Sequence, residues 1–231
     1  MLSGLRARQR VPELMDDPAL DPAEHRRALA GLARLNRFSA GAAVLWPAIA
    51  KLAAELKRTV RVLDVATGSG DIPCALVMRA RRAGIALDVS ACDVSPTAIE
   101  EATRRSSAVR FFVHDALHER LPGGFDVVTC SLFLHHLGDE EAVALLANME
   151  NAAGHMILVN DLARSRRNCC AVWFMCRVLT RSRVVWFDGP ASVRSAFTPQ
   201  EALALAERAG LSGATAELRF PCRFLLSWRR Q

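Results

Sequence analysis

The chain has 231 residues, 51% of them hydrophobic and 23% charged, which is ordinary for a soluble globular enzyme and sufficient for one sizeable core. The formal net charge is +6, and all 30 basic residues except Lys51 and Lys57 are arginines. No arginine run alternates with aromatic residues as a stacking surface requires, so we do not expect a nucleic-acid partner.

Metal binding and membrane insertion are not expected either. The seven cysteines form no CxxC pair, and His135 and His136 are adjacent rather than spaced as metal ligands. The most hydrophobic segment, 169–187, is interrupted by three arginines and does not predict a membrane span. The N-terminus lacks the apolar core of a signal peptide, so we expect a cytoplasmic protein.

The chain begins with a predicted helical region, 21–57. Asp21 is the expected N-cap, Pro22 takes the first helical position, and Pro47 is expected to divide the region into two helices. From residue 60, short apolar runs alternate with helical stretches. The predicted strands are 60–65, 86–92, 109–113, 125–133 and 155–160, with helices starting near residues 71, 95 and 139. This alternation indicates a parallel sheet covered on both faces.

The alternation stops over 162–195, a stretch rich in Arg, Trp, Phe and Cys. A helix then follows, with Thr198 as N-cap, Glu201 as its capping-box partner and Gly210 at its end. Two strands, 214–220 and 222–228, complete the pattern. We expect an N-terminal helical cap over 1–58 and an α/β core over 59–231. The 162–195 insertion should form a lid together with the N-terminal helices.

The first strand runs into a glycine-containing turn, "RVLDVATGSGDIP". Gly68 and Gly70 fit the first two positions of a dinucleotide fingerprint, but Pro73 occupies the third. Asp64 lies four residues before Gly68, where its carboxylate would repel a pyrophosphate and attract an ammonium and a sulfonium. S-adenosylmethionine carries both of these cationic groups.

Two further acids follow the next two strands. Asp93, twenty-three positions after Gly70, is placed to accept hydrogen bonds from both ribose hydroxyls. Asp115 follows the third strand and is placed to accept from the adenine amino group. Acids at the ends of strands one, two and three, in that order, favour S-adenosylmethionine over NAD.

The order "LDVATGSGD", "CDVSPTAIEEA", "FFVHDAL", "FDVVTCSLFLHHL" resembles the class I S-adenosylmethionine-dependent methyltransferases of the small UbiE-like, or methyltransferase-domain, type. The resemblance implies a Rossmann-like, mostly parallel seven-stranded sheet whose last strand is antiparallel. It also implies that the cofactor is S-adenosylmethionine, released as S-adenosylhomocysteine. Ala66 stands where the family usually has glycine; if its φ is negative, alanine adds only a methyl group, and we expect slightly tighter packing rather than lost binding. The implied cofactor-binding residues are Asp64, Ala66, Thr67, Gly68, Gly70, Asp93, Val94, His114, Asp115, Ala116, Ser131, Leu132 and, from the N-terminal region, Arg37.

The acceptor is expected beyond the carboxyl ends of the strands. For a hydroxyl acceptor the reaction needs a base, and histidine suits this role, so His135 or His136 is the candidate catalytic group. Structural roles for either histidine remain open. The candidate substrate-binding residues are Asp161, Arg164, Trp173, Trp186 and Arg194; a packing role for the aromatic residues and an ion pair of Arg194 with Asp188 remain alternatives.

The favoured function is methyl transfer to an oxygen, less often a carbon, of a small phenolic, polyketide-like or carboxylic metabolite of secondary metabolism. An RNA or protein methyltransferase, or a non-catalytic methyltransferase-like subunit, is the alternative. An NAD-dependent reductase is disfavoured because the chain has no tyrosine to act as the proton donor. The expected partner is an apolar or aromatic small molecule, and the protein is expected to be a monomer or a homodimer.

Overall fold

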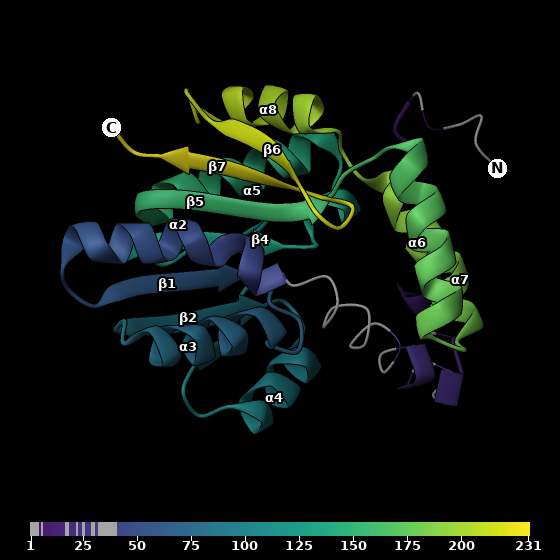
Figure 1. Ribbon diagram of the computed structural model, residues 1–231, viewed down its shortest axis with the longest axis horizontal. Helices are drawn as coiled ribbons and strands as arrows, with labels where there is room; N and C mark the ends of the chain where they lie inside the picture. Colours follow the sequence, from purple (N-terminus) through teal and green to yellow (C-terminus); the bar gives the residue numbers. More distant parts are fainter. Residues whose placement is uncertain are drawn as a thin grey trace.

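The computed structural model describes residues 41–231 and, before them, residues 5, 7–16, 19–21, 23, 24, 26–28 and 31. One seven-stranded sheet with the order β3-β2-β1-β4-β5-β7-β6 runs through the molecule (Figure 1). The strands β1 to β5 are parallel, and β7 inserts antiparallel between β5 and β6. The predicted Rossmann-like sheet is confirmed. The strands are β1 Val60–Val65, β2 Leu87–Asp93, β3 Arg110–Val113, β4 Phe125–Ser131, β5 Ala153–Leu162, β6 Thr215–Arg219 and β7 Arg223–Arg229.

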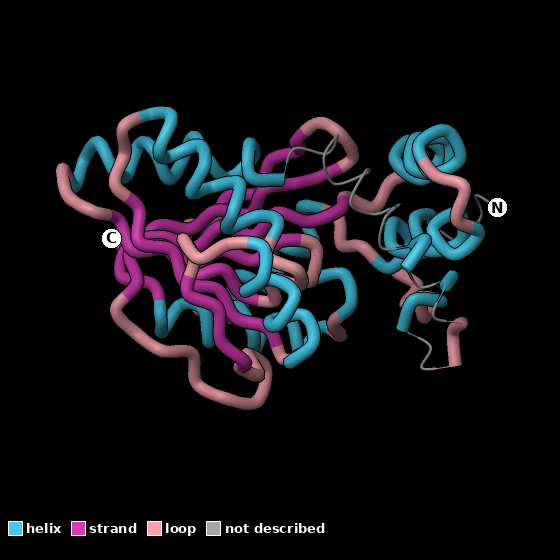
Figure 2. Tube along the Cα trace, turned by 90° about the horizontal axis from the view of Figure 1, so that it is seen from below, coloured by secondary structure: helices cyan, strands magenta, loops and turns pink. Residues whose placement is uncertain are grey.

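Helices cover both faces of this sheet, as the magenta strands between cyan helices show in Figure 2. Alternate residues of the central strands point to opposite faces, so Val62 and Val127 pack on one side and Leu63 and Val128 on the other. The first side is covered by α2 (Gly41–Leu56) and α3 (Asp71–Ala83), and α4 (Pro96–Arg105) packs beside β3. The second side is covered by α5 (Asp139–Ala152) and α8 (Pro199–Arg208).

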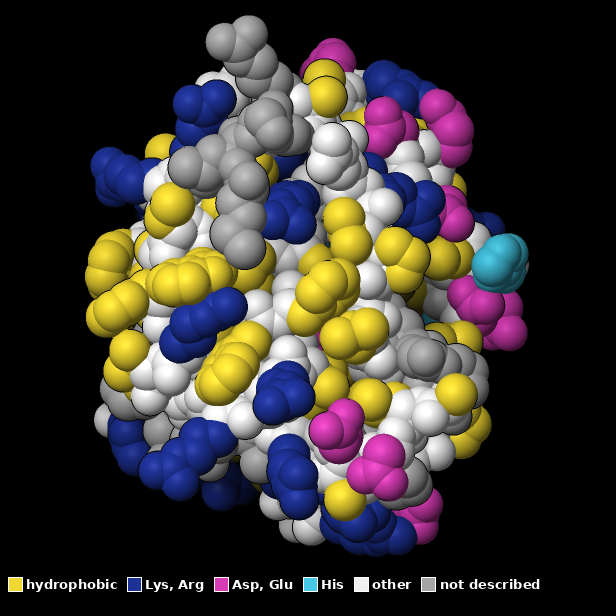
Figure 3. Space-filling model, turned by 90° about the vertical axis from the view of Figure 1, so that its right-hand side faces the viewer, with side chains coloured by type: hydrophobic (Ala, Val, Ile, Leu, Met, Phe, Trp, Pro, Cys, Tyr) yellow, Lys and Arg dark blue, Asp and Glu magenta, His cyan; other side chains and the backbone are white. Residues whose placement is uncertain are grey.

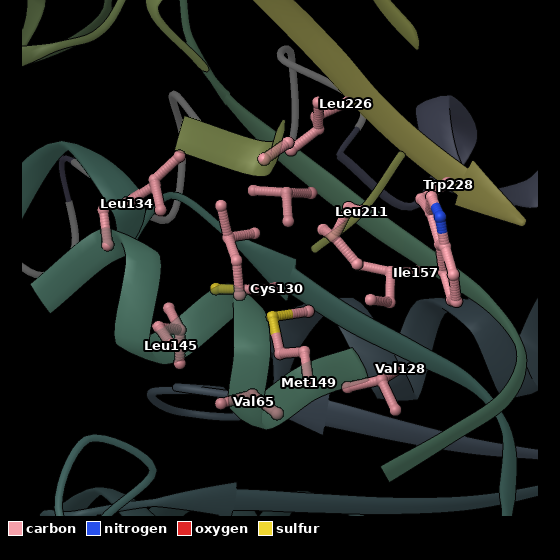
Figure 4. Close-up of a cluster of buried hydrophobic side chains, with 14 of the residues drawn as sticks. Val65, Val128, Cys130, Leu134, Leu145, Met149, Ile157, Leu211, Leu226 and Trp228 are labelled. Atoms are coloured by element: carbon pink, nitrogen blue, oxygen red, sulfur yellow. The ribbon is translucent and has the colours of Figure 1, made fainter. Parts of the chain in front are cut away.

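The larger of the two cores lies under α5 and α8. Met149 of α5 and Ile157 of β5 are fully buried there, and Trp228 of β7 closes one end (Figure 4). This core fixes the strands whose carboxyl ends carry the predicted site residues.

The predicted break at Pro47 is wrong, because α2 runs through it. Proline lacks the N–H that would bond the carbonyl of Ala43, which costs the helix one hydrogen bond. Leu45, Ile49 and Leu52 on the same helix are fully buried against the sheet. Burial of this apolar stripe therefore outweighs the local cost. The predicted N-cap Asp21 is confirmed by its hydrogen bonds from the backbone N–H groups of Ala23 and Glu24.

The predicted 162–195 insertion forms two helices, α6 (Arg166–Leu179) and α7 (Arg183–Ser195). They pack against each other and stand beyond the carboxyl ends of the parallel strands (Figures 1 and 2). A short N-terminal segment crosses α7 through hydrogen bonds from Arg8 and Gln9 to the carbonyls of Ser195 and Arg194. Within the described part of the chain, no helix has the length and apolar character needed to cross a membrane.

The α8 capping box provides a direct test of the fold. Thr198 accepts from the N–H of Glu201, and the Glu201 carboxylate accepts from the N–H of Thr198. We predict that Thr198→Ala lowers the free energy of unfolding by about 1 kcal/mol, because one N-terminal donor loses its partner. Urea denaturation measures this loss. Thr198→Ser keeps the hydroxyl and should retain most of the stability; equal losses in both variants would contradict the capping role.

Candidate active site

The turn between β1 and α3 has three residues in the left-handed region: Ala66 (φ 54°), Gly68 (φ 54°) and Gly70 (φ 76°). Glycine adopts this conformation without a steric penalty, whereas for alanine the conformation is strained. The negative φ that the expectation for Ala66 required is therefore not present. Gly70 is also required by packing, since a Cβ there would lie 2.8 Å from the ring of Phe111. At Gly68 a Cβ would meet nothing within 4 Å, so the turn is open there.

Asp64 is bonded to this turn through the side chain of Thr67. Its side chain is buried, and its two carboxylate oxygens accept hydrogen bonds from the hydroxyls of Thr67 (2.8 Å) and Thr129 (2.6 Å). Burial raises the pKa of Asp64 to about 6, against the opposing effect of the two hydroxyls. The hydrogen bond from Thr67 therefore ties this buried carboxylate to the turn.

Asp93, at the end of β2, joins the glycine turn to the next helix. One carboxylate oxygen accepts from the N–H of Gly68 at 2.8 Å, and the other accepts from the N–H of Ser95 at 2.9 Å. Each oxygen retains a second lone pair. Val94, the next residue, is exposed. Asp93 is thus placed both to hold the turn and to accept from a ligand lying over it.

Asp115, after β3, is held in a local turn. One of its oxygens accepts from the N–H groups of Leu117 and His118, and the other lies 2.9 Å from His118 Nδ1. The hydrogen bond from His118 keeps the pKa of Asp115 below its usual value, so Asp115 is an anionic acceptor near neutral pH. The backbone N–H of His114 donates to the carbonyl of Asp93, which ties the ends of β2 and β3 together. Ala116 is buried.

Several buried polar atoms at the strand ends have no hydrogen-bond partner among the described residues: Ser131 Oγ, His114 Nε2 and both amide atoms of Asn160. Leaving such an atom unpaired costs about 1–3 kcal/mol. Ser131 ends β4, His114 follows β3, and Asn160 lies opposite Ser131 on β5. A ligand with hydroxyl, amino and carboxylate groups over these strand ends would satisfy them. The residues present therefore fit S-adenosylmethionine.

Beyond β4 the chain turns sharply and forms a short 3₁₀ helix, η2 (Leu134–His136). Leu132 adopts a left-handed φ of 56°, and its N–H donates to the carbonyl of Asn160. This turn sends the two adjacent histidines into different environments. His135 is buried, whereas His136 is partly exposed.

His135 forms a buried pair with Asp161 of β5. Its Nδ1 lies 2.7 Å from one carboxylate oxygen of Asp161, and its backbone N–H donates to the other oxygen at 2.9 Å. Burial, the largest single effect, lowers the pKa of His135, but the charge and hydrogen bond of Asp161 and the charge of Glu13 together outweigh it and raise that pKa above the usual value. Burial would likewise raise the pKa of Asp161, but the His135 charge and hydrogen bonds lower it.

The pKa of His136 shifts the other way. Burial, and then the neighbouring His135 charge, lower it to about 4. His136 is therefore neutral near pH 7 and a weak base. The pairing with Asp161 distinguishes the two histidines and favours His135 as the group that exchanges a proton.

Because Nδ1 of His135 is taken by Asp161, Nε2 is the nitrogen left for a substrate. It lies 3.8 Å from a carboxylate oxygen of Glu13, on the N-terminal segment. Both residues line a cavity of about 280 Å³ between η2, the start of β7 and the inner face of α6 and α7. The remaining lining residues are Leu132, His136, Leu162, Val172, Met175, Cys176, Gly189, Ser192, Pro221, Cys222 and Arg223.

Glu13, His135 and His136 offer one ligand atom each within 4.8 Å of one another. This is the geometry of a possible metal site, which the sequence did not predict. The positive charges of Arg223 and Arg10 act on His135 and His136 respectively, and they oppose the binding of a cation there.

The structure separates the predicted substrate residues. Asp161 reaches the cavity through His135, but Arg164 does not: its buried guanidinium bonds the carbonyls of Ala196 and Leu5 and pairs with Glu201. Trp173, Trp186 and Arg194 line a different cavity, on the outer side of α6 and α7. Arg37 lies outside the described residues.

Sequence reasoning did not select Glu13, Asn160 or Arg223 for the site. Asn160 and Arg223 are buried at the end of β5 and the start of β7, and burial lowers the pKa of Arg223 to about 10. A signal was present, because each is polar within or beside a predicted apolar strand. Glu13 lies on a segment for which the sequence predicts no regular structure.

Comparison with known proteins agrees with this geometry. Residues 62–153 match the family model described as the methyltransferase domain. A demethylmenaquinone methyltransferase from Thermus thermophilus is 34% identical over 132 residues, which are 54% of this chain and 58% of that protein. Over these residues the chain resembles the class I S-adenosylmethionine-dependent methyltransferases. Its match thus spans less than two thirds of that curated relative.

Solved methyltransferase structures share the fold at low sequence identity. The S-adenosylmethionine-dependent methyltransferase SibL, in its apo form, has a TM-score of 0.68 at 20% identity, covering 98% of this chain and 64% of SibL. The plantazolicin methyltransferase BamL, with a desmethyl analogue and S-adenosylhomocysteine, has a TM-score of 0.69 at 14% identity, covering 89% and 90%. The magnesium protoporphyrin IX methyltransferase of Synechocystis PCC 6803, with S-adenosylhomocysteine, has a TM-score of 0.56 at 17% identity, covering 93% and 90%.

The left-handed alanine predicts an unusual mutational response. Ala66→Gly should raise the free energy of unfolding by about 1 kcal/mol, because glycine removes the steric cost of this φ. The same substitution in the middle of a helix, Ala147→Gly in α5, should lower it by about 1 kcal/mol. Urea denaturation of both variants provides the test. A loss of stability in Ala66→Gly would show that this φ is not strained.

Asp64 predicts a pH dependence of cofactor binding. Its pKa of about 6 means that the carboxyl is protonated at pH 5 and ionised at pH 7, and only the ionised form attracts the amino group of the ligand. We predict that S-adenosylhomocysteine affinity, measured by calorimetry, rises from pH 5 to pH 7. In Asp64→Asn this rise should be lost. An unchanged pH profile in the variant would contradict the assignment.

Proposed function

We propose that the protein transfers the methyl group of S-adenosylmethionine to a hydroxyl oxygen of a small, largely apolar acceptor in the cavity beside His135. The observation that carries this proposal is the 2.7 Å hydrogen bond between His135 Nδ1 and Asp161, which leaves Nε2 for the acceptor. Like a carboxylate–histidine pair in other general-base sites, it fixes the tautomer and orientation of the imidazole.

In this proposal the cofactor binds at the carboxyl ends of β1 to β4. Asp93 would accept from the ribose hydroxyls and Asp115 from the adenine amino group, while Asp64 and Thr67 would favour the cationic methionine end. When bound, the cofactor supplies an electrophilic methyl group. The turn at Leu132, which lines the cavity, would lie where the bound cofactor meets the acceptor.

His135 performs the proton transfer. In its neutral form, Nε2 would accept the acceptor's hydroxyl proton as the oxygen takes the methyl group that the bound cofactor would supply, leaving S-adenosylhomocysteine. The Asp161 carboxylate stabilises the resulting imidazolium. Arg223, buried beside Asp161 and lining the cavity, would stabilise developing negative charge on the acceptor oxygen.

The cavity favours a small acceptor. Its volume of about 280 Å³ lies at the lower end of ligand pockets, and its walls include Leu132, Leu162, Val172 and Met175. A phenol or a short polyketide-like ring of secondary metabolism fits this volume and polarity. The names of the relatives, which include demethylmenaquinone and plantazolicin methyltransferases, also favour a small molecule over nucleic acid.

The proposal is tested by incubating the purified protein with S-adenosylmethionine and a panel of phenols, carboxylic acids and their ring-substituted analogues. Mass spectrometry should show the gain of one methyl group on a phenolic hydroxyl, and fragmentation distinguishes an O-methyl from a C-methyl product. S-adenosylhomocysteine binding without turnover of any acceptor would favour a non-catalytic binding subunit. Methylation of RNA or protein instead would overturn the acceptor assignment.

The raised pKa of His135 predicts the pH profile. A general base must be neutral, so kcat should fall on the acid side with a midpoint above the ordinary histidine value of 6.5. Asp161→Asn removes the charge that raises this pKa, so the midpoint should move down and kcat should also fall. His135→Ala should lower kcat at least about 100-fold.

Two controls separate catalysis from folding and from metal dependence. In His136→Ala the fall of kcat on the acid side should keep its midpoint, because the pKa of His136 is about 4. All variants should retain S-adenosylhomocysteine binding. Treatment with EDTA should leave kcat unchanged. Loss of activity with EDTA, restored by a divalent metal, would contradict base catalysis by His135 and instead favour a metal held with Glu13 and His136.

A further inference from the structure

The helical pair α6–α7 has two different faces. Its inner face contributes Val172, Met175 and Ser192 to the acceptor cavity. Its outer face carries a second, larger cavity of about 700 Å³, whose apolar lining comes from Trp173 and Phe174 of α6 and Trp186, Phe187 and Pro190 of α7. The proposed reaction uses only the inner face, so the outer face requires a separate explanation.

The outer face exposes large hydrophobic side chains. Phe174 is 61% exposed, Val178 63% and Phe187 46%, and they lie on the two helices that form the outer cavity. Such side chains are common singly on protein surfaces, but a cluster of them indicates an interaction site. In Figure 3, hydrophobic and basic side chains adjoin one another on the side of the molecule that carries α6 and α7.

The charge of this face is strongly positive. Residues 166–195 contain six arginines and one acid, Asp188. The Asp188 side chain is buried and accepts from the backbone N–H groups of Leu14 and Met15, so its charge is directed inward. Glu24 lies at the edge of the face, beside Arg181 and Arg183. Arg177, Arg183 and Arg194 line the outer cavity itself.

The arginines and the aromatic rings are arranged together. The guanidinium of Arg177 lies over the Trp173 ring, 3.9 Å from its centroid, and 5.7 Å from that of Trp186. In this arrangement the aliphatic part of arginine covers apolar surface while its charge stays at the polar boundary. Tryptophan and arginine side by side, with phenylalanine and valine beyond them, are typical of helices that lie in a membrane interface.

We propose that the outer face of α6–α7 docks on the surface of an anionic lipid membrane. Phe174, Val178 and Phe187 would enter the boundary of headgroups and acyl chains, and the arginines would pair with lipid phosphates. Docking of this kind is peripheral and needs no membrane-crossing helix.

The same observations disfavour the other occupants. In a symmetric dimer through this face, the arginines of one copy would meet those of the other, and the like charges would repel. A nucleic acid would pair with the arginines but would leave the exposed Phe174 and Val178 without an apolar partner. If the proposed function holds, docking also places the acceptor cavity one helix layer from the membrane, where lipid-soluble phenols collect.

The test is co-sedimentation with vesicles of phosphatidylcholine alone and of phosphatidylcholine mixed equally with phosphatidylglycerol. We expect binding to the mixed vesicles, weak or no binding to phosphatidylcholine, and weakening as salt is raised. The double variants Phe174→Ser/Phe187→Ser and Arg177→Glu/Arg183→Glu should each reduce binding to the mixed vesicles at least about tenfold.

Matched control variants come from α3, on the opposite side of the molecule (Figure 1). Met78→Ser and Arg82→Glu remove an exposed hydrophobic side chain and an exposed arginine there, and they should leave vesicle binding unchanged. Every variant should retain S-adenosylhomocysteine binding, which shows that it is folded and separates this proposal from the proposed function. No binding to mixed vesicles, equal binding to both kinds, or equal losses in the α3 variants would overturn the proposal. A concentration-dependent dimer lost in the Phe174→Ser/Phe187→Ser variant, without vesicle binding, would assign the face to a second copy instead.

Discussion

The buried carboxylate of Asp161 organises the side of the molecule that carries the proposed acceptor cavity. It fixes the start of η2 through the backbone N–H of His135, orients the imidazole through Nδ1, and lies beside the buried Arg223. The carbonyls of His135 and Leu137 in turn accept from Arg8, which bonds Ser195 at the end of α7. One charge at the end of β5 therefore connects the sheet, the catalytic candidate, the N-terminal segment and the insertion. A buried carboxylate without these partners would be costly, so the arrangement is also a structural requirement.

The insertion after β5 supplies residues to two cavities, one on each face of the α6–α7 pair. The proposed acceptor cavity is lined by residues of α6 and α7 and by Glu13. Both faces of this helical pair carry apolar residues. The inner face lines the cavity beside His135, and the outer face combines apolar side chains with arginines. The proposed cofactor and acceptor sides meet at Leu132, which follows β4 and has a left-handed conformation that redirects the chain.

Much of the fold could be predicted because it rests on local patterns. Apolar runs predicted the strands, and Thr198 and Asp21 predicted helix starts. Because the carboxyl ends of parallel strands lie at one edge of the sheet, Asp93 and Asp115 were expected at the same edge. The rest depends on distant contacts. No local signal tells His135 from His136, since the difference is a partner 26 residues away in the sequence. The burial of Arg164 against Glu201, and of Arg223 beside Asp161, is likewise invisible in a chain with so many arginines. Ala66 shows that tertiary constraint can impose a backbone conformation that its residue type disfavours.

The central claim is that the acids at the ends of the first strands hold S-adenosylmethionine, apart from the acceptor groups on η2. Calorimetric titration of Asp93→Ala and the unmodified protein with S-adenosylhomocysteine tests it most directly, with NADH as a parallel ligand. We predict tight binding of S-adenosylhomocysteine alone, weakened by about 1–3 kcal/mol in Asp93→Ala, since the variant loses an anionic acceptor and the anchor of Gly68. Equal affinity in the two proteins, or preferential binding of NADH, would contradict the account.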